Sequence, residues 1–151
     1  MAIRIIAIGK KHEAWTASGI ERYQKRLRKP YDVEWVLLPH SAREGQEARQ
    51  EESERIHARM SPDDYVVLLD ERGDLLSSPA LSRLLEQQLA SSPVTVVIGG
   101  AYGVDDRLMK RANKTWSLSP LVFPHQLVRL ILAEQLYRAQ AIASGSAYHH
   151  E

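Results

Sequence analysis

The chain has 151 residues, of which 44% are hydrophobic, enough to bury the core of one domain. A formal net charge of +1 gives no overall attraction to nucleic acid, so any RNA contact has to come from a local basic cluster. The lack of cysteine excludes a disulfide scaffold and a thiolate zinc site and fits a reducing, cytoplasmic location, and we expect no signal peptide.

Strand and helix patterns alternate along the whole chain. Apolar, β-branched runs predict strands at residues 2–8, 33–38, 65–69 and 94–98. Helical patterns cover residues 13–27, 44–60, 78–90, 105–112 and 125–144. We expect a turn at residues 70–74, and residues 116–118 are too few for an ordinary strand. The alternation predicts an α/β fold with a mainly parallel sheet and helices on both faces, in a single domain spanning residues 1–151.

Three strand ends carry residues suited to binding a ligand. Ligands of parallel sheets bind at the carboxyl ends of the strands, and Leu69-Asp70, Gly99-Gly100 and Leu118-Ser119 are three such ends. The adjacent glycines allow positive φ and let a ligand approach the backbone closely. A tight turn without any ligand is the alternative for this glycine pair. One pocket could gather all three ends.

The last predicted helix is apolar around nearly its whole circumference. Such a helix must be covered on more than one side, and a chain of this length leaves little protein to cover it. We therefore expect it to lie in the interface of a homodimer. Arg129, Glu134 and Arg138 within the run argue against a membrane span.

Two basic clusters are candidates for contacting RNA phosphates. One holds five cations in the eight residues 22–29, and the other has Arg107, Lys110, Arg111 and Lys114 at a spacing that shares one helix face. Solvated helix faces are the alternative meaning of both clusters. The residues expected to bind RNA are Arg22, Lys25, Arg26, Arg107, Lys110, Arg111 and Arg129.

Four motifs in the last third of the chain resemble those of a known family. IGGAYGV, WSLSPLVFPHQLVR, EQLYRA and the terminal AYHHE are together similar to the RlmH family, a branch of the SPOUT methyltransferases. The resemblance implies a SPOUT α/β-knot with a C-terminal trefoil knot, and a homodimer. It implies methylation of N3 of a pseudouridine in large-subunit ribosomal RNA, within the assembled ribosome, with S-adenosyl-L-methionine as cofactor.

The resemblance also carries expectations for single residues of the cofactor site. The positions that match the family's cofactor contacts are Leu69, Gly99, Leu118, Ser119, Pro120, Leu121, Val122 and Phe123, and Gly100 lies in the same loop. For Leu121, Val122 and Phe123, a role as plain core residues is the alternative.

The catalytic candidates are a histidine at the pocket and residues near the C-terminus. His125 begins the last helix, where a structural or capping histidine is the alternative. The family's tail has a Tyr-His pair, matched by Tyr148 and His149, followed by a basic residue, where this chain has His150. We expect His149 to assist the departure of the N3 proton, Arg138 to orient the base from the partner subunit, and His150 to contact RNA. A disordered polar terminus is the alternative.

Two other functions remain open at this point. A Rossmann-like small-molecule enzyme is disfavoured because the GGAYG loop lacks the GxGxxG spacing. A non-catalytic RNA-binding or ribosome-binding module could use the same fold. The six histidines show no ligand spacing typical of a metal site, so we expect no metal.

Overall fold

The structure, a computed structural model, describes residues 3–150. Ala2, the first residue of the first expected strand, and Glu151, the last residue of the tail motif, lie outside these residues. The strands are β1 (Ile3–Ile8), β2 (Val33–Leu38), β3 (Tyr65–Leu75), β4 (Val94–Ile98) and β5 (Lys114–Ser117). The helices are α1 (Ala14–Gln24), α2 (Gly45–His57), α3 (Ser78–Leu89), α4 (Asp106–Arg111) and α5 (His125–Ala143).

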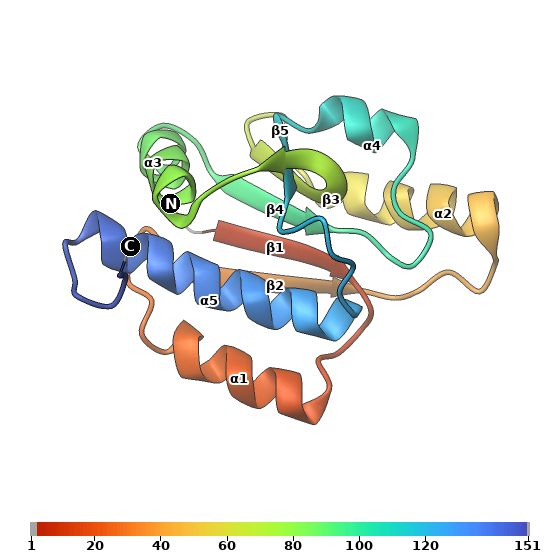
Figure 1. Cartoon of the computed structure of the whole chain (residues 1–151). Coiled ribbons are helices and arrows are strands. Elements are labelled where there is room, and N and C mark those ends of the chain that lie inside the picture. Colours follow the sequence, from red (N-terminus) through yellow and green to blue (C-terminus); the bar gives the residue numbers. More distant parts are fainter. Residues whose placement is uncertain (1–2, 151) are drawn as a thin grey trace.

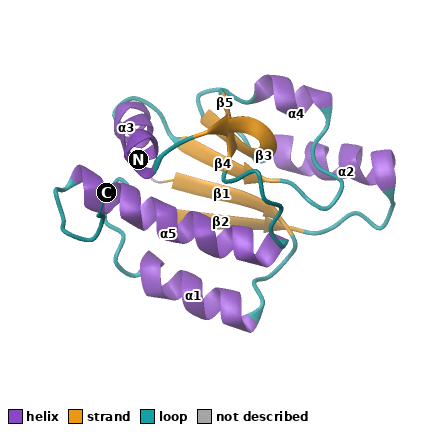
Figure 2. Cartoon of the chain, in the orientation of Figure 1, coloured by secondary structure: helices purple, strands orange, loops and turns teal. Residues whose placement is uncertain are grey.

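The five strands form one sheet in the order β2-β1-β4-β3-β5, and every neighbouring pair is parallel (Figures 1 and 2). Side chains on β1 alternate between two cores, with Ile3 and Ile5 in one and Ile6 and Ile8 in the other. Helices α3 and α5 contribute to the first core, and α2 and α4 to the second. The predicted α/β fold with helices on both faces is confirmed, whereas the trefoil knot stays a prediction.

The edge of the sheet differs from the sequence prediction. Strand β3 continues to Leu75, where a turn was expected after Leu69, and β5 pairs with it through a register shift between Leu69 and Asp74. Gly73 permits this arrangement, because a Cβ there would lie 2.5 Å from the backbone carbonyl carbon of Thr115. The expected turn at residues 70–74 is therefore wrong, and the segment near residue 116 is a short strand of four residues. Close packing of a glycine against another strand leaves no local sequence signal.

Helix α5 lies between α1 and α3 across one face of the sheet (Figure 1). Leu132, Leu136 and Ala139 are buried in the first core, whereas Leu127 and Ile131 stay partly exposed. One chain thus covers only part of this apolar helix, and the homodimer stays a prediction. Among residues 3–150, none of the helices combines the length and the hydropathy needed to cross a membrane.

Candidate functional site

A cavity of about 1330 Å³ lies at the carboxyl ends of the strands. Leu69 and Asp70 of β3, the glycine loop after β4 and the segment after β5 all line it, so the expectation that three strand ends share one pocket is confirmed. The expected cofactor residues that line it are Leu69, Gly99, Gly100, Leu118, Ser119, Leu121, Val122 and Phe123. Pro120 is the exception among the expected cofactor residues, since it is absent from the lining.

The glycine loop after β4 is a tight turn closed by a hydrogen bond from the Gly103 amide to the Gly100 carbonyl oxygen, 3.0 Å long. Positive φ occurs at Gly103 (77°) and at neither Gly99 nor Gly100, so the adjacent pair does not use the positive φ that glycine allows. A Cβ on Gly99 would lie 2.9 Å from Cγ1 of Val104, and one on Gly100 would lie 2.5 Å from Oε1 of Glu52. These two glycines are therefore required by packing within the protein, which in turn fixes the wall of the cavity.

The segment between β5 and α5 presents apolar side chains on the surface. Leu121 and Val122 are 69% and 81% exposed, so the alternative that they are plain core residues is wrong. Both line the cavity, as does the partly buried Phe123. The segment offers an apolar wall, which suits the flat and largely apolar face of a nucleoside.

His125, the first residue of α5, lines the cavity close to the glycine loop. Burial, and then the positive charge of Arg129, lower the pKa of His125 to about 4, although a hydrogen bond with the Gly99 backbone acts in the opposite direction. The ring is therefore neutral near pH 7 and a weak base, which argues for a hydrogen-bonding role in place of proton transfer.

Three residues that line the cavity have a buried polar side-chain atom without a hydrogen-bond partner within residues 3–150. The atoms are Nε2 of His125, Nε1 of Trp116 and Nε of Arg129. Buried polar groups are nearly always hydrogen-bonded in folded proteins. Their position at one cavity therefore fits a ligand with polar atoms as well as an apolar body, as an adenosine-containing cofactor has.

Arg129 is fully buried and cannot contact RNA, so the RNA-binding role expected for it is wrong. Its guanidinium donates to the carbonyl oxygens of Ile8 (3.0 Å), Gly9 (3.1 Å) and Lys11 (3.1 Å). It also lies 3.1 Å from Nδ1 of His12. Burial lowers the pKa of Arg129. The side chain therefore fixes the loop between β1 and α1 against the start of α5.

Four residues near the C-terminus form what we call the tail cluster: Glu134, Arg138, Tyr148 and His149. The Tyr148 hydroxyl donates to Oε2 of Glu134 (2.8 Å), and Nη2 of Arg138 donates to the same oxygen (2.8 Å). The guanidinium carbon of Arg138 lies 4.8 Å from the ring centroid of Tyr148. Burial, followed by the contact with Glu134, raises the pKa of Tyr148 to about 12, so its hydroxyl stays protonated. The tail is thus packed against α5, in contrast to the alternative of a disordered terminus.

Glu134 was missed as a functional candidate, although it opens the EQLYRA motif.

The contact between Arg138 and His149 determines which ring nitrogen of the neutral histidine carries the proton. Nη1 of Arg138 lies 3.1 Å from Nδ1 of His149, and a guanidinium can only donate. Nδ1 is therefore the acceptor, and the proton of the neutral ring sits on Nε2.

The tail cluster and the cavity lie at opposite ends of α5. His125 begins the helix and Arg138 lies near its end, a separation of roughly 20 Å at the rise of an α-helix. None of the four residues of the tail cluster lines the cavity. Figure 1 shows the segment that follows α5 folding back beside the last turn of this helix, away from the arrowheads of the strands. Within one chain, the two groups of candidate residues cannot act on the same substrate atom.

The basic residues are only partly available to a nucleic acid. Arg22, Lys25 and Arg26 are exposed at the end of α1 and just after it, and Arg107 and Lys110 are exposed on α4; His150 is exposed too. Arg111 is half-buried and donates to the carbonyl oxygens of Ser61 (3.1 Å) and Asp64 (2.9 Å). Lys114 belongs to β5 and pairs with Asp74 (2.8 Å). The prediction that four basic residues share one exposed helix face is therefore wrong. Of the four, Arg107 and Lys110 are exposed on α4.

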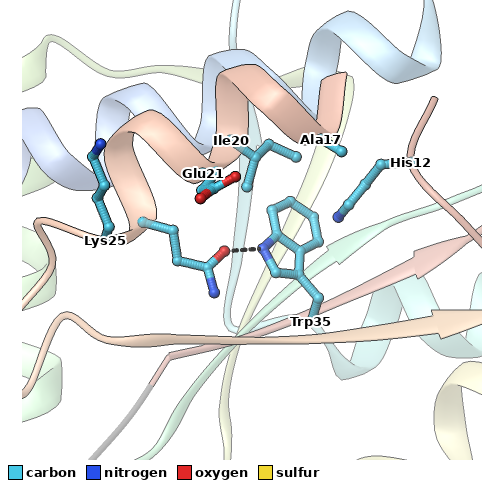
Figure 3. Close-up of a pocket in the computed structure, with 7 residues that line it drawn as sticks. His12, Ala17, Ile20, Glu21, Lys25 and Trp35 are labelled. Atoms are coloured by element: carbon cyan, nitrogen blue, oxygen red, sulfur yellow. Dashed lines mark hydrogen bonds between the residues drawn. The ribbon is translucent and has the colours of Figure 1, made fainter. Parts of the chain in front are cut away.

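A second cavity, of about 560 Å³, lies between α1 and β2 (Figure 3). Trp35 lines it; Nε1 of this residue donates to Oε1 of Gln24 (2.9 Å), and its ring meets the ring of His12 edge-on, with centroids 4.7 Å apart. None of the expected cofactor residues lines this cavity, and Lys25 is the one expected RNA-binding residue there. In the described part of the chain, residues 3–150, no three His, Asp or Glu side chains are grouped to hold a metal ion.

Comparison with known proteins agrees with this geometry. A family model described as "Predicted SPOUT methyltransferase" matches residues 1–149. A protein of Acetivibrio thermocellus is 42% identical over 158 residues, covering 99% of both chains, and one of Hahella chejuensis is 37% identical over 156 residues, covering 100% of both. A third, from Parasynechococcus marenigrum, is 42% identical and covers 97% of this chain and 94% of its own. All three are named "Ribosomal RNA large subunit methyltransferase H". The chain therefore belongs to the SPOUT methyltransferase family.

Proposed function

We propose that this protein transfers a methyl group from S-adenosyl-L-methionine to N3 of a pseudouridine in large-subunit ribosomal RNA. Family membership supports methyl transfer, and the names of the full-length relatives support ribosomal RNA as the substrate. The choice of pseudouridine N3, and of the assembled ribosome as the substrate particle, rests on the resemblance to the RlmH family. The protein acts in the cytoplasm as one SPOUT methyltransferase domain spanning residues 1–151.

The strand-end cavity is the proposed cofactor site. Leu69, the glycine loop and the segment from Leu118 to Phe123 would enclose the cofactor, with His125 and Trp116 offering unmatched polar atoms. When bound, the cofactor supplies a methyl group activated by attachment to a positively charged sulfur. The protein's contribution is to hold the acceptor nitrogen in line with that methyl group.

The active site is completed by a second subunit. The observation that carries this step is the separation of roughly 20 Å between the cavity and the tail cluster along α5. In a two-fold dimer that packs the α5 helices antiparallel, the partner's tail cluster would lie at this chain's cavity. The partly exposed apolar residues of α5 provide a surface for such packing. A composite site of this kind makes the homodimer obligatory for activity.

Within the composite site, His149 would act as a hydrogen-bond donor. The N3 proton must leave as the methyl group arrives, and negative charge then develops on the ring and its carbonyl oxygens. Nε2–H of His149 can donate to such an oxygen, and the adjacent guanidinium of Arg138 strengthens the effect. This role replaces proton acceptance by His149, because the basic nitrogen of its ring is engaged by Arg138. The proton would pass to solvent.

Two measurements test the proposal. Calorimetric titration with S-adenosylhomocysteine should give one site per chain, and the absence of binding would favour the non-catalytic RNA-binding alternative. Incubation with ribosomes that lack the modification should produce 3-methylpseudouridine, detected by mass spectrometry of digested RNA. Cofactor binding without any methylated nucleoside would contradict the proposed substrate.

A further inference from the structure

The strand-end cavity is lined by most of the large hydrophobic side chains that are exposed among the described residues. Of the five large hydrophobic side chains that are exposed among residues 3–150, four line this cavity: Trp15, Tyr102, Leu121 and Val122. Single exposed hydrophobic residues are normal, but a group at one cavity indicates a binding surface. Leu121 and Val122 belong to the proposed cofactor wall. Trp15, 51% exposed at the start of α1, has no such role.

The backbone that carries Trp15 is held in place before any ligand binds. Arg129 fixes the carbonyl oxygens of Gly9 and Lys11. The Glu13 amide donates to Oε1 of Gln126 on α5 (2.9 Å). Nε1 of Trp15 donates to Oε2 of Glu13 (2.7 Å), which orients the indole. The loop is therefore attached to α5 at both ends, and its indole is presented in a fixed orientation.

The same loop carries two adjacent cations at the cavity. Lys10 and Lys11 are exposed and line it, and neither belongs to an ion pair within the described residues 3–150. The neighbouring carboxylate of Glu13 accepts from Trp15. By contrast, Arg72, on the β3 side of the cavity, is paired with Asp70 (2.9 Å). The ammonium groups of Lys10 and Lys11 thus remain available to an anionic ligand.

We propose that the loop of residues 9–15 is the RNA contact beside the methylation site, where Trp15 stacks on an unpaired nucleobase next to the target and Lys10 and Lys11 contact its phosphates. This inference rests on the proposed function, because it takes the acceptor to be RNA. Aromatic side chains bind splayed-out bases by stacking, and lysines bind phosphates with release of counterions. An exposed indole next to two unpaired lysines provides both, at the mouth through which the acceptor base has to enter.

The stacking part is tested by measuring affinity for ribosomes that lack the modification, in the presence of S-adenosylhomocysteine and at several salt concentrations. Trp15→Ala should weaken binding by roughly 5- to 150-fold without changing the salt dependence. Trp15→Phe, which keeps an aromatic face, should retain most of the affinity. Leu75→Ala removes an exposed apolar side chain away from the cavity and serves as the control, with unchanged affinity.

The phosphate part has a different signature. The double variant Lys10→Gln/Lys11→Gln should reduce the slope of log affinity against log salt concentration by about 0.7–0.9 for each phosphate group that a lysine neutralises in the parent. Arg83→Gln, a change of an exposed cation on α3, should leave the slope as in the parent. An unchanged slope in the lysine double variant would overturn the phosphate assignment.

Calorimetry with S-adenosylhomocysteine and light scattering on each variant separate the possible failures. If the parent neither binds the cofactor product nor methylates ribosomes, the proposed function fails and this inference falls with it. If the parent is active, three results overturn the role of Trp15: an unaffected Trp15→Ala variant, equally weakened binding in Trp15→Phe and Trp15→Ala, or loss of cofactor binding or of the dimer in Trp15→Ala. The last result would assign the indole to the cofactor wall or to the subunit interface.

Discussion

Nη2 of Arg129 donates to the carbonyl oxygen of Gly9 across 120 positions of sequence, and the absence of a side chain at Gly9 makes the contact possible. Gly9 has φ of 120°, and a Cβ there would lie 2.7 Å from Nη2 of Arg129. The end of β1 and the start of α5 are joined at this point, beside the cavity.

Gly9→Ala should destabilise the protein through both backbone strain and the clash with Arg129. Strained backbone alone costs about 1–3 kcal/mol, so the loss of unfolding free energy should exceed this range. Gly145→Ala is the matched control, because Gly145 also has positive φ (73°) but no atom within 4 Å of an added Cβ. Urea unfolding measures both variants, and equal destabilisation of the two would contradict the role given to this hydrogen bond.

Arg129→Met should lower the free energy of unfolding by more than the similar size of the two side chains suggests. The change leaves the buried carbonyl oxygens of Ile8 and Gly9 without their donor, at about 1–3 kcal/mol for each unsatisfied group. Arg83→Met, on the exposed face of α3, should change stability by less than about 0.5 kcal/mol. If urea unfolding gives similar values for both, Arg129 does not hold the loop between β1 and α1 against α5.

The stability of the protein should fall as the pH is lowered from 7 toward 4. The pKa of His125 is about 4 in the folded chain and 6.5 in the unfolded chain, so between these values the unfolded chain alone binds the proton. Above about pH 7.5 the group has no effect, since both states are neutral. His125→Asn should therefore show a smaller loss of unfolding free energy across this window. The pKa values of His12 and His57 are lowered too, mainly by burial, so part of the pH dependence should remain. Identical pH profiles of unfolding free energy for parent and variant would contradict the claim that the His125 ring is buried and neutral in the folded chain.

Glu134→Gln should lower turnover while leaving cofactor binding intact. The carboxylate holds both Arg138 and the Tyr148 hydroxyl, so the amide weakens the arrangement of the tail cluster. The cavity residues are untouched, and calorimetry with S-adenosylhomocysteine should give the parent affinity. Glu86→Gln, an exposed change on α3, serves as the control for removal of a charge. Parent-like turnover in Glu134→Gln would contradict a role of the tail cluster in the reaction.

The sheet and the cavity could be predicted from the sequence because both follow from local patterns. Strand runs such as Val94–Ile98, followed by glycine or serine, fix where parallel strands end and therefore where a ligand binds. Arg129 was misassigned because its partners are backbone carbonyls more than a hundred positions away, and a charged side chain is rarely buried without a carboxylate. Glu134 was missed for a related reason, since its role depends on the tail folding back so that Tyr148 reaches it.

The most direct test of the composite site is complementation between two inactive variants. Gly99→Val should distort the cavity wall, because even a Cβ at Gly99 would lie 2.9 Å from Cγ1 of Val104, which also lines the cavity, and His149→Ala removes the donor of the tail cluster. Each variant alone should fail to transfer tritiated methyl groups to ribosomes that lack the modification. When the two are unfolded together and refolded as a mixture, half of the dimers pair one variant with the other, and each such dimer has one intact site. A composite site predicts recovery of roughly one quarter of the parent activity. A mixture that contains the mixed dimer but stays inactive would contradict it, because the cavity and the tail cluster would then have to come from the same chain.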